Sequence, residues 1–183
     1  MQDVAARDAA NPTAFRLQEA YRWTREVVAD LTEGQLRWQP NPTAPAIRFH
    51  LFHIARWADV LHQMITEAEA QVWHAEGIAA RWGLDPAALG FGESGALIED
   101  GVAMALPFPD RSALFAYCDR VIAAADRVLA DIDDDAMARE MTYGGRTSAL
   151  GVLLADQLSH TARHLGMIEC LRGVQGLRGT ASV

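Results

Sequence analysis

Apolar residues recur at the spacing of amphipathic helices in four long stretches of the chain. The stretches cover about residues 12–30, 46–70, 111–131 and 147–172. The first one follows Asn11, which can cap a helix ahead of a proline at the first helical position. No alternating strand pattern competes with them. The pattern therefore predicts an all-α four-helix bundle with a crossover insertion between helices 2 and 3, as a single domain over residues 1–183.

The segments between these helices contain short sequence patterns that predict turns, caps and one short helix. Residues 71–111 contain a short predicted helix over residues 72–82, followed by turns rich in glycine and proline, and they form either a lid or pocket wall or a plain crossover. Asp110 can cap the third long helix, and Thr147 or Ser148 can cap the fourth. The remaining signals predict a capped turn at residues 32–36, an exposed acidic helix end at 131–135 and a turn at 143–146.

Two histidines stand four residues apart in the fourth predicted helix. His160 and His164 lie about 40° apart on one helix face, and Asp156 precedes them by one turn on the same face. That face is mostly apolar and includes Met167. Burying imidazoles and a carboxylate there is costly unless a partner satisfies them. A divalent metal would do so, because neutral imidazole is a common metal ligand, and histidines hydrogen-bonded within the core are the alternative.

His53 adds a third imidazole from the second predicted helix. It is the one polar member of an inward apolar stripe on that helix. His50 is offset by about 60° and could flank a site, whereas His62 lies about 180° away and is expected to face solvent. Three histidines with an open fourth position describe a catalytic metal site, because closed structural zinc sites are usually rich in cysteine.

Two charged residues near this constellation have open interpretations. Asp156 could orient His160 through its second ring nitrogen, reach the metal itself, or face solvent. Arg56, one turn from His53, could hold a substrate carboxylate or lie at the surface.

The fourth helix is apolar on a second side as well, which requires cover on both sides. A central place in the bundle would provide that cover. A helix shared with a second copy of the chain would provide it too.

Composition narrows the classes of function. The 183 residues carry a net charge of −8 without a run of lysines and arginines, which argues against binding to nucleic acid or to anionic lipid. No apolar run reaches the roughly 18 residues of a membrane span, and the first residues have no signal-peptide core. Cys118 and Cys170 form no CxxC motif and are expected to be reduced, so we expect a cytoplasmic protein. The sequence also lacks HExxH, GxSxG and P-loop motifs.

Two segments that carry the histidines resemble a known family. Residues 49–59 read FHLFHIARWAD, and residues 160–168 read HTARHLGMI, followed by LRG at residues 171–173. These segments are similar to the second-helix and fourth-helix motifs of the DinB-like (damage-inducible, YfiT-like) superfamily of metalloenzymes. The likeness covers most of the chain in its layout, and the two histidine segments are its specific part.

The resemblance implies a four-helix bundle, often homodimeric, with a divalent metal on a histidine triad that falls on His53, His160 and His164. Relatives in that family include transferases and isomerases that use a low-molecular-weight thiol such as mycothiol or bacillithiol. Two residues depart from the family pattern. Met167 replaces the usual glutamine, and Ala58 stands where an acidic residue often precedes the aspartate. Neither departure removes a predicted ligand.

These observations lead us to expect a metal-dependent enzyme with nickel or zinc on the three histidines. It would act on a small-molecule substrate as a hydrolase or as a thiol-dependent transferase, and work as a homodimer without nucleic-acid or membrane partners. The alternative is a non-catalytic bundle, a stress-response or small-molecule-binding protein in which the metal serves only the structure.

Overall fold

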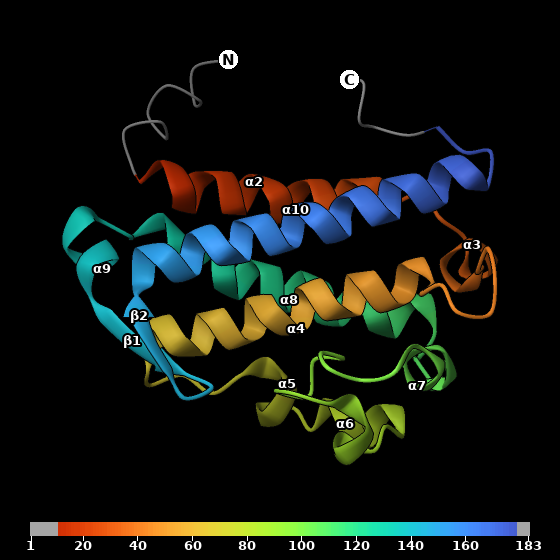
Figure 1. The fold of residues 1–183 in the computed structure, drawn as a ribbon, viewed down its shortest axis with the longest axis horizontal. Coiled ribbons are helices and arrows are strands. Elements are labelled where there is room, and N and C mark those ends of the chain that lie inside the picture. The colour runs from red at the N-terminus through yellow and green to blue at the C-terminus, as the bar shows by residue number, and fades with distance from the viewer. Residues whose placement is uncertain (1–10, 179–183) are drawn as a thin grey trace.

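The four predicted helices form a bundle in the computed structural model, which describes residues 11–178. The amino-terminal stretch for which we expected no signal peptide lies outside the described residues. The four long helices are α2 (Pro12–Val28), α4 (Ile47–Thr66), α8 (Arg111–Ala130) and α10 (Leu150–Val174). Each helix packs on two others, in the cyclic order α2, α10, α4, α8 (Figure 1). The all-α bundle predicted from the sequence is confirmed.

Side-chain caps fix the starts of several helices, among them two of the four long ones. Asn11 accepts hydrogen bonds from the backbone N–H groups of Thr13 and Ala14, and Asp110 accepts one from that of Ala113. The turn predicted at residues 32–36 is the short helix α3 (Glu33–Arg37), which begins with a capping box. These polar residues satisfy N–H groups that a helix end leaves without a partner, so the first and third long helices begin where the sequence placed them.

A β-hairpin precedes α10, and the sequence did not predict it. Strands β1 (Glu140–Tyr143) and β2 (Arg146–Ala149) pair in antiparallel register around Gly144 and Gly145, whose φ angles are 59° and 78°. Positive φ at both central residues is what a two-residue hairpin turn requires. The turn at residues 143–146 is therefore confirmed, while the expectation of no strand is wrong. The expected helix caps Thr147 and Ser148 lie in β2, and α10 begins at Leu150.

The acidic run after α8 is partly helical. Asp133 caps a short helix, α9 (Asp134–Ala138), by accepting a hydrogen bond from the N–H of Ala136. No residue of α9 is buried, so the predicted exposure of this acidic segment holds, although we expected a helix end and loop.

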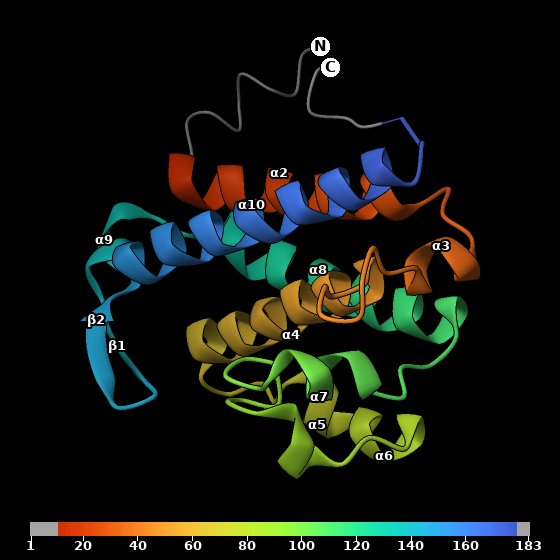
Figure 2. The same ribbon diagram turned by 45° about the vertical axis from the view of Figure 1, so that its right-hand side comes forward.

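The crossover between α4 and α8 lies along the outer side of α4 (Figures 1 and 2). It contains the short elements α5 (Val72–Ala75), α6 (Ile78–Trp82), η1 (Pro86–Leu89) and α7 (Asp100–Ala105). The single helix expected over residues 72–82 is broken at Gly77, whose φ is 59°. The rings of Trp73 and Trp82 pack against Phe52 of α4 and Tyr117 of α8, which buries the crossover's apolar side.

Arg56 of α4 is fully buried and uses all five of its N–H donors. Its Nε donates to the carbonyl of Glu93 at 3.0 Å, and Nη2 donates to the carbonyl of Gly92 at 2.9 Å and to Gln71 at 2.8 Å. Nη1 donates to Asp59 and to the hydroxyl of Tyr117, both at 3.2 Å. The surface position considered for Arg56 is wrong, because the crossover covers this side of α4.

Asp59 completes this buried cluster. Its two carboxylate oxygens accept the backbone N–H groups of Val72 and Trp73, each at 2.8 Å, at the start of α5. The hydroxyl of Tyr117 donates to the same carboxylate at 3.1 Å, and burial raises the pKa of that hydroxyl well above its usual value. An ion pair inside α4 therefore holds the start and the middle of the crossover against the bundle.

A second buried arginine joins the carboxyl ends of α10 and α2. Arg172 is 5% exposed and donates to the carbonyl of Val27 at 2.7 Å and to Asp30 at 2.6 Å. It therefore satisfies a carbonyl at the end of α2 that lacks a partner within its helix.

The fourth long helix is not central, because it packs on two helices of the bundle, as each of the other three does, so the central place considered for it is wrong. It contacts both α2 and α4, yet Val152, Met167 and Val174 are 53%, 49% and 60% exposed. The inward position expected for Met167 is therefore wrong. Among the described residues, no helix is both long and apolar enough to cross a membrane.

Replacement of Asp59 by alanine should lower the free energy of unfolding by about 3–5 kcal/mol, because it leaves the Arg56 guanidinium buried without its counter-charge. Urea denaturation followed by circular dichroism, in the presence of a chelator, measures this. Asp119→Ala is the matched control, since its ion pair with Arg25 leaves the Asp119 side chain 57% exposed and should contribute about 1 kcal/mol or less. Equal losses in the two variants would contradict the role assigned to the buried pair.

Candidate metal centre

Three imidazoles meet where α4 packs against α10. His53 comes from α4, and His160 and His164 come from successive turns of α10. The ring centroids of His53 lie 4.9 Å from His160 and 4.6 Å from His164, and those of His160 and His164 are 4.6 Å apart. One ring nitrogen of each residue lies within 4.8 Å of the other two. The structure therefore brings together the three histidines that the helical periodicity selected.

The hydrogen bonds of His53 orient it for metal binding. Its Nδ1 lies 2.5 Å from the carbonyl oxygen of Ser94, which can only accept, so Nδ1 carries the proton. The lone pair of Nε2 then points toward Nε2 of His160, 3.0 Å away. Ligands of a tetrahedral zinc ion with Zn–N bonds of about 2.1 Å are separated by about 3.4 Å. The residues therefore fit a divalent metal, and the carbonyl of Ser94 fills the outer position that usually fixes a ligating imidazole.

All three imidazoles are held in the uncharged form that binds a metal. Burial lowers the pKa of His53, and burial together with the repulsion between protonated imidazoles lowers the pKa of His160 to about 4 and that of His164 to about 3. At neutral pH each imidazole therefore keeps one ring nitrogen without a proton, ready to bind an ion.

The other two histidines of α4 are both buried. Nδ1 of His50 lies 2.9 Å from Nδ1 of His164, so His50 flanks the triad, as expected, and can orient that ring. His62 is only 2% exposed, with Nε2 3.1 Å from the carboxylate of Glu69. The solvent-facing position expected for His62 is wrong, because α3, α5, α8 and α10 together cover most sides of α4.

The carbonyl that holds His53 belongs to a tightly fixed part of the crossover. Arg56 binds the carbonyls of the two residues before Ser94, and Trp73 Nε1 donates to the Glu93 carboxylate at 2.6 Å. The next residue, Gly95, has a φ of 82°, and a Cβ there would lie 3.0 Å from the Phe49 ring. The sequence analysis missed Ser94, since a backbone carbonyl has no residue signature, and only the cluster of glycines marked the segment.

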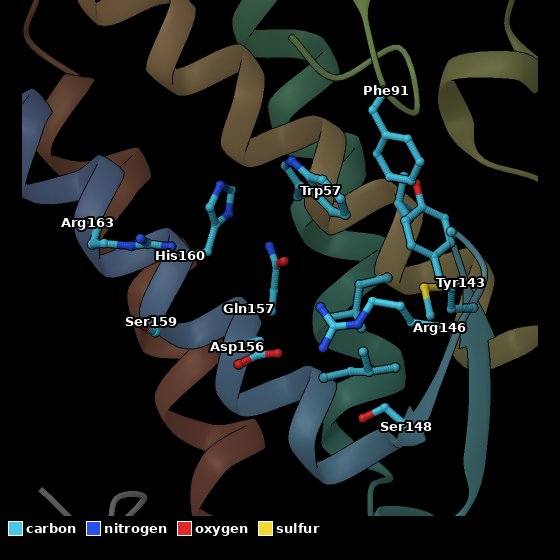
Figure 3. A pocket seen from close by; sticks show the side chains of 15 residues that line it. Trp57, Phe91, Tyr143, Arg146, Ser148, Asp156, Gln157, Ser159, His160 and Arg163 are labelled. Carbon is cyan, nitrogen blue, oxygen red and sulfur yellow. The ribbon is translucent and has the colours of Figure 1, made fainter. Parts of the chain in front are cut away.

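A cavity of about 450 Å³ opens beside His160 (Figure 3). One wall is aromatic, with Trp57 from α4, Phe91 from the crossover and Tyr143 from β1. Their ring centroids are 5.5–6.3 Å apart, and Trp57 is 5.8 Å from His160. Part of the crossover therefore forms a pocket wall, the first of our two alternatives for this segment.

Asp156 and Arg56, for which the sequence left several roles open, both lie apart from the three histidines. Asp156 is exposed at the cavity, and His160 Nδ1 is buried with no hydrogen-bond partner among residues 11–178. Asp156 therefore does not orient His160 in this structure, and it lies outside the cluster of ring nitrogens. Arg56 lines no part of the cavity, and its donors are all engaged.

Comparisons with known proteins agree with this fold. A crystal structure of a conserved protein from Enterococcus faecalis aligns with a TM-score of 0.70 and 16% sequence identity, covering 87% of this chain and 92% of that one. That likeness shows the fold alone. No curated protein matches the chain. The family model of the DinB superfamily matches residues 16–168, a span that includes all three histidines of the cluster. The chain therefore belongs to the DinB superfamily.

Proposed function

We propose that this protein is a metal-dependent enzyme in which His53, His160 and His164 hold one divalent ion, zinc or nickel. The observation that carries the proposal is the convergence of three uncharged imidazoles beside a cavity of about 450 Å³. No carboxylate or thiol of the described residues joins the three nitrogens to complete a closed shell. Membership in a superfamily of metal-binding proteins supports the same reading.

Such an ion, when bound, would act as a Lewis acid and lower the pKa of a water or a thiol in its open position. The proposed reactions are hydrolysis, or transfer to a low-molecular-weight thiol such as mycothiol or bacillithiol, with a small-molecule substrate. The chain's own part is to hold the imidazoles. Ser94 fixes the ring of His53, His50 contacts the ring of His164, and aromatic side chains form one wall of the adjoining cavity.

We also propose that the protein works in the cytoplasm as a homodimer. The apolar residues Val152, Met167 and Val174 remain exposed on α10, and a second copy of the chain would cover them.

Alanine at any one of the three histidines should remove the metal. Purified wild-type protein is expected to hold about one divalent ion per chain, and His53→Ala, His160→Ala and His164→Ala far less, because two imidazoles bind an ion much more weakly than three. Elemental analysis by mass spectrometry measures the content. His74→Ala is the control, since His74 is exposed and outside the cluster. Stoichiometric metal in all three triad variants would refute the site.

The open coordination position can be tested by adding a thiol to the zinc-loaded protein. X-ray absorption should then show one new zinc–sulfur distance of about 2.3 Å. The same experiment on His160→Ala protein gives the background from unspecific zinc. An unchanged spectrum, together with a large drop in thermal stability on metal removal, would support the rival proposal that the metal only holds the bundle together.

Metal affinity should resist mild acid. Protonation abolishes an imidazole ligand; for His160 and His164 it begins only near their lowered pKa values of about 4 and about 3, and burial lowers the pKa of His53 as well. We therefore expect the association constant to change by less than about threefold between pH 7 and 5.5, and to fall steeply below pH 4. Isothermal titration calorimetry measures it. A loss that begins near pH 6.5, where ordinary histidines titrate, would contradict the effect of burial.

A further inference from the structure

The cavity beside the candidate metal centre is lined by two arginines whose guanidinium groups bind no residue in the described part of the chain. Arg146 and Arg163 both line it. Neither forms a hydrogen bond or an ion pair with any residue in the range 11–178, in contrast to Arg56 and Arg172. Free guanidinium groups at the wall of a cavity are available to a ligand.

The two arginines approach the cavity from different elements. Arg163 lies on α10 between His160 and His164, and its side chain extends toward His160 (Figure 3). Its charge contributes to the lowered pKa of His160, after burial and after His53, which places it near the metal centre. Arg146 begins β2 and reaches from the hairpin across the cavity toward α10 (Figure 3).

The hairpin that presents Arg146 is fixed against the crossover. The Tyr143 ring lies 5.8 Å from Trp57 and 5.5 Å from Phe91. A Cβ on Gly144 would lie 2.8 Å from the Phe91 ring, so the turn touches the crossover directly. Arg146 therefore projects from a held backbone, which lowers the entropy lost when it binds a ligand.

The charge of the cavity is opposite to that of the whole protein. The chain has a net charge of −8, whereas the charged residues lining the cavity are the two arginines and one carboxylate, Asp156. Most of the other lining side chains are apolar or aromatic: Trp57, Val60, Leu61, Met64, Phe91, Tyr143 and Leu153. Such a surface suits a molecule with an apolar body and one negative charge.

We propose that this cavity binds a small carboxylic acid with an apolar or aromatic body, and that Arg146 and Arg163 hold its carboxylate. The proposal rests on the proposed function, since it names the substrate class of that site. A guanidinium matches a carboxylate with two parallel hydrogen bonds. Two arginines opposed by Asp156 leave a single positive charge, which matches a carboxylate better than a dianionic phosphate. The apolar body lies against Trp57 and Phe91.

The test compares 4-phenylbutyrate with the uncharged, nearly isosteric 4-phenylbutyramide by titration calorimetry on metal-loaded protein. We expect the acid to bind about tenfold more tightly, and Arg146→Gln and Arg163→Gln each to reduce that preference about five- to tenfold. Arg127→Gln is the control, an exposed arginine of α8 outside the cavity. Asp156→Asn should act in the opposite direction and strengthen binding of the acid about two- to threefold, because it removes a like charge.

The same titrations on metal-free protein distinguish the proposed carboxylate site from the proposed metal-dependent enzyme. The preference for the acid should persist after chelation, because the arginines and not the metal hold the carboxylate. Equal binding of acid and amide, no saturable binding of the acid, or a preference that survives both arginine substitutions would overturn the inference and leave the metal enzyme intact. Protein that binds no metal, yet keeps a preference dependent on the arginines, would overturn the proposed function and leave the carboxylate site standing.

Discussion

A guanidinium removed from water needs an acceptor for each of its N–H groups, and this requirement at Arg56 orders the whole region beside the metal centre. Three of its five acceptors belong to the crossover, including the backbone carbonyls of Gly92 and Glu93. Meeting that demand places the next carbonyl, that of Ser94, against His53. The buried charge thus stabilises the fold and sets the direction of an imidazole at once.

The candidate metal centre and the cavity differ in how their side chains carry charge: the imidazoles are uncharged, and the arginines of the cavity are charged. The bundle strips water from the three imidazoles and keeps them neutral, which suits a divalent ion. Arg163, which lies between His160 and His164 in the sequence of α10, stays exposed and lines the cavity. In the enzyme proposed above, a substrate would therefore meet largely buried, uncharged imidazoles at one side of the cavity and an exposed, charged side chain at another.

Much of the fold and the triad could be predicted from the sequence, because both follow from helical periodicity. His53, His160 and His164 were selected by their faces alone. Periodicity reports one helix at a time, so it could not tell that the crossover would bury Arg56 and that His62 would be covered on the outer side of α4. Four-residue strands are too short to show alternation, and a backbone carbonyl leaves no trace in the sequence. The contacts of Arg56 with Gly92 and of His53 with Ser94 join residues far apart in the chain, and the periodicity of a single helix does not reveal them.

The aromatic wall is assembled from separate parts of the chain, and this arrangement has a consequence for divergence among relatives. The hairpin contributes Tyr143 and Arg146 to the cavity but none of the three clustered imidazoles. Its surface position lets mutation or insertion there reshape what the cavity accepts while the ligating rings stay in place. Selectivity can thus drift independently of reactivity, which is how one scaffold comes to serve many substrates.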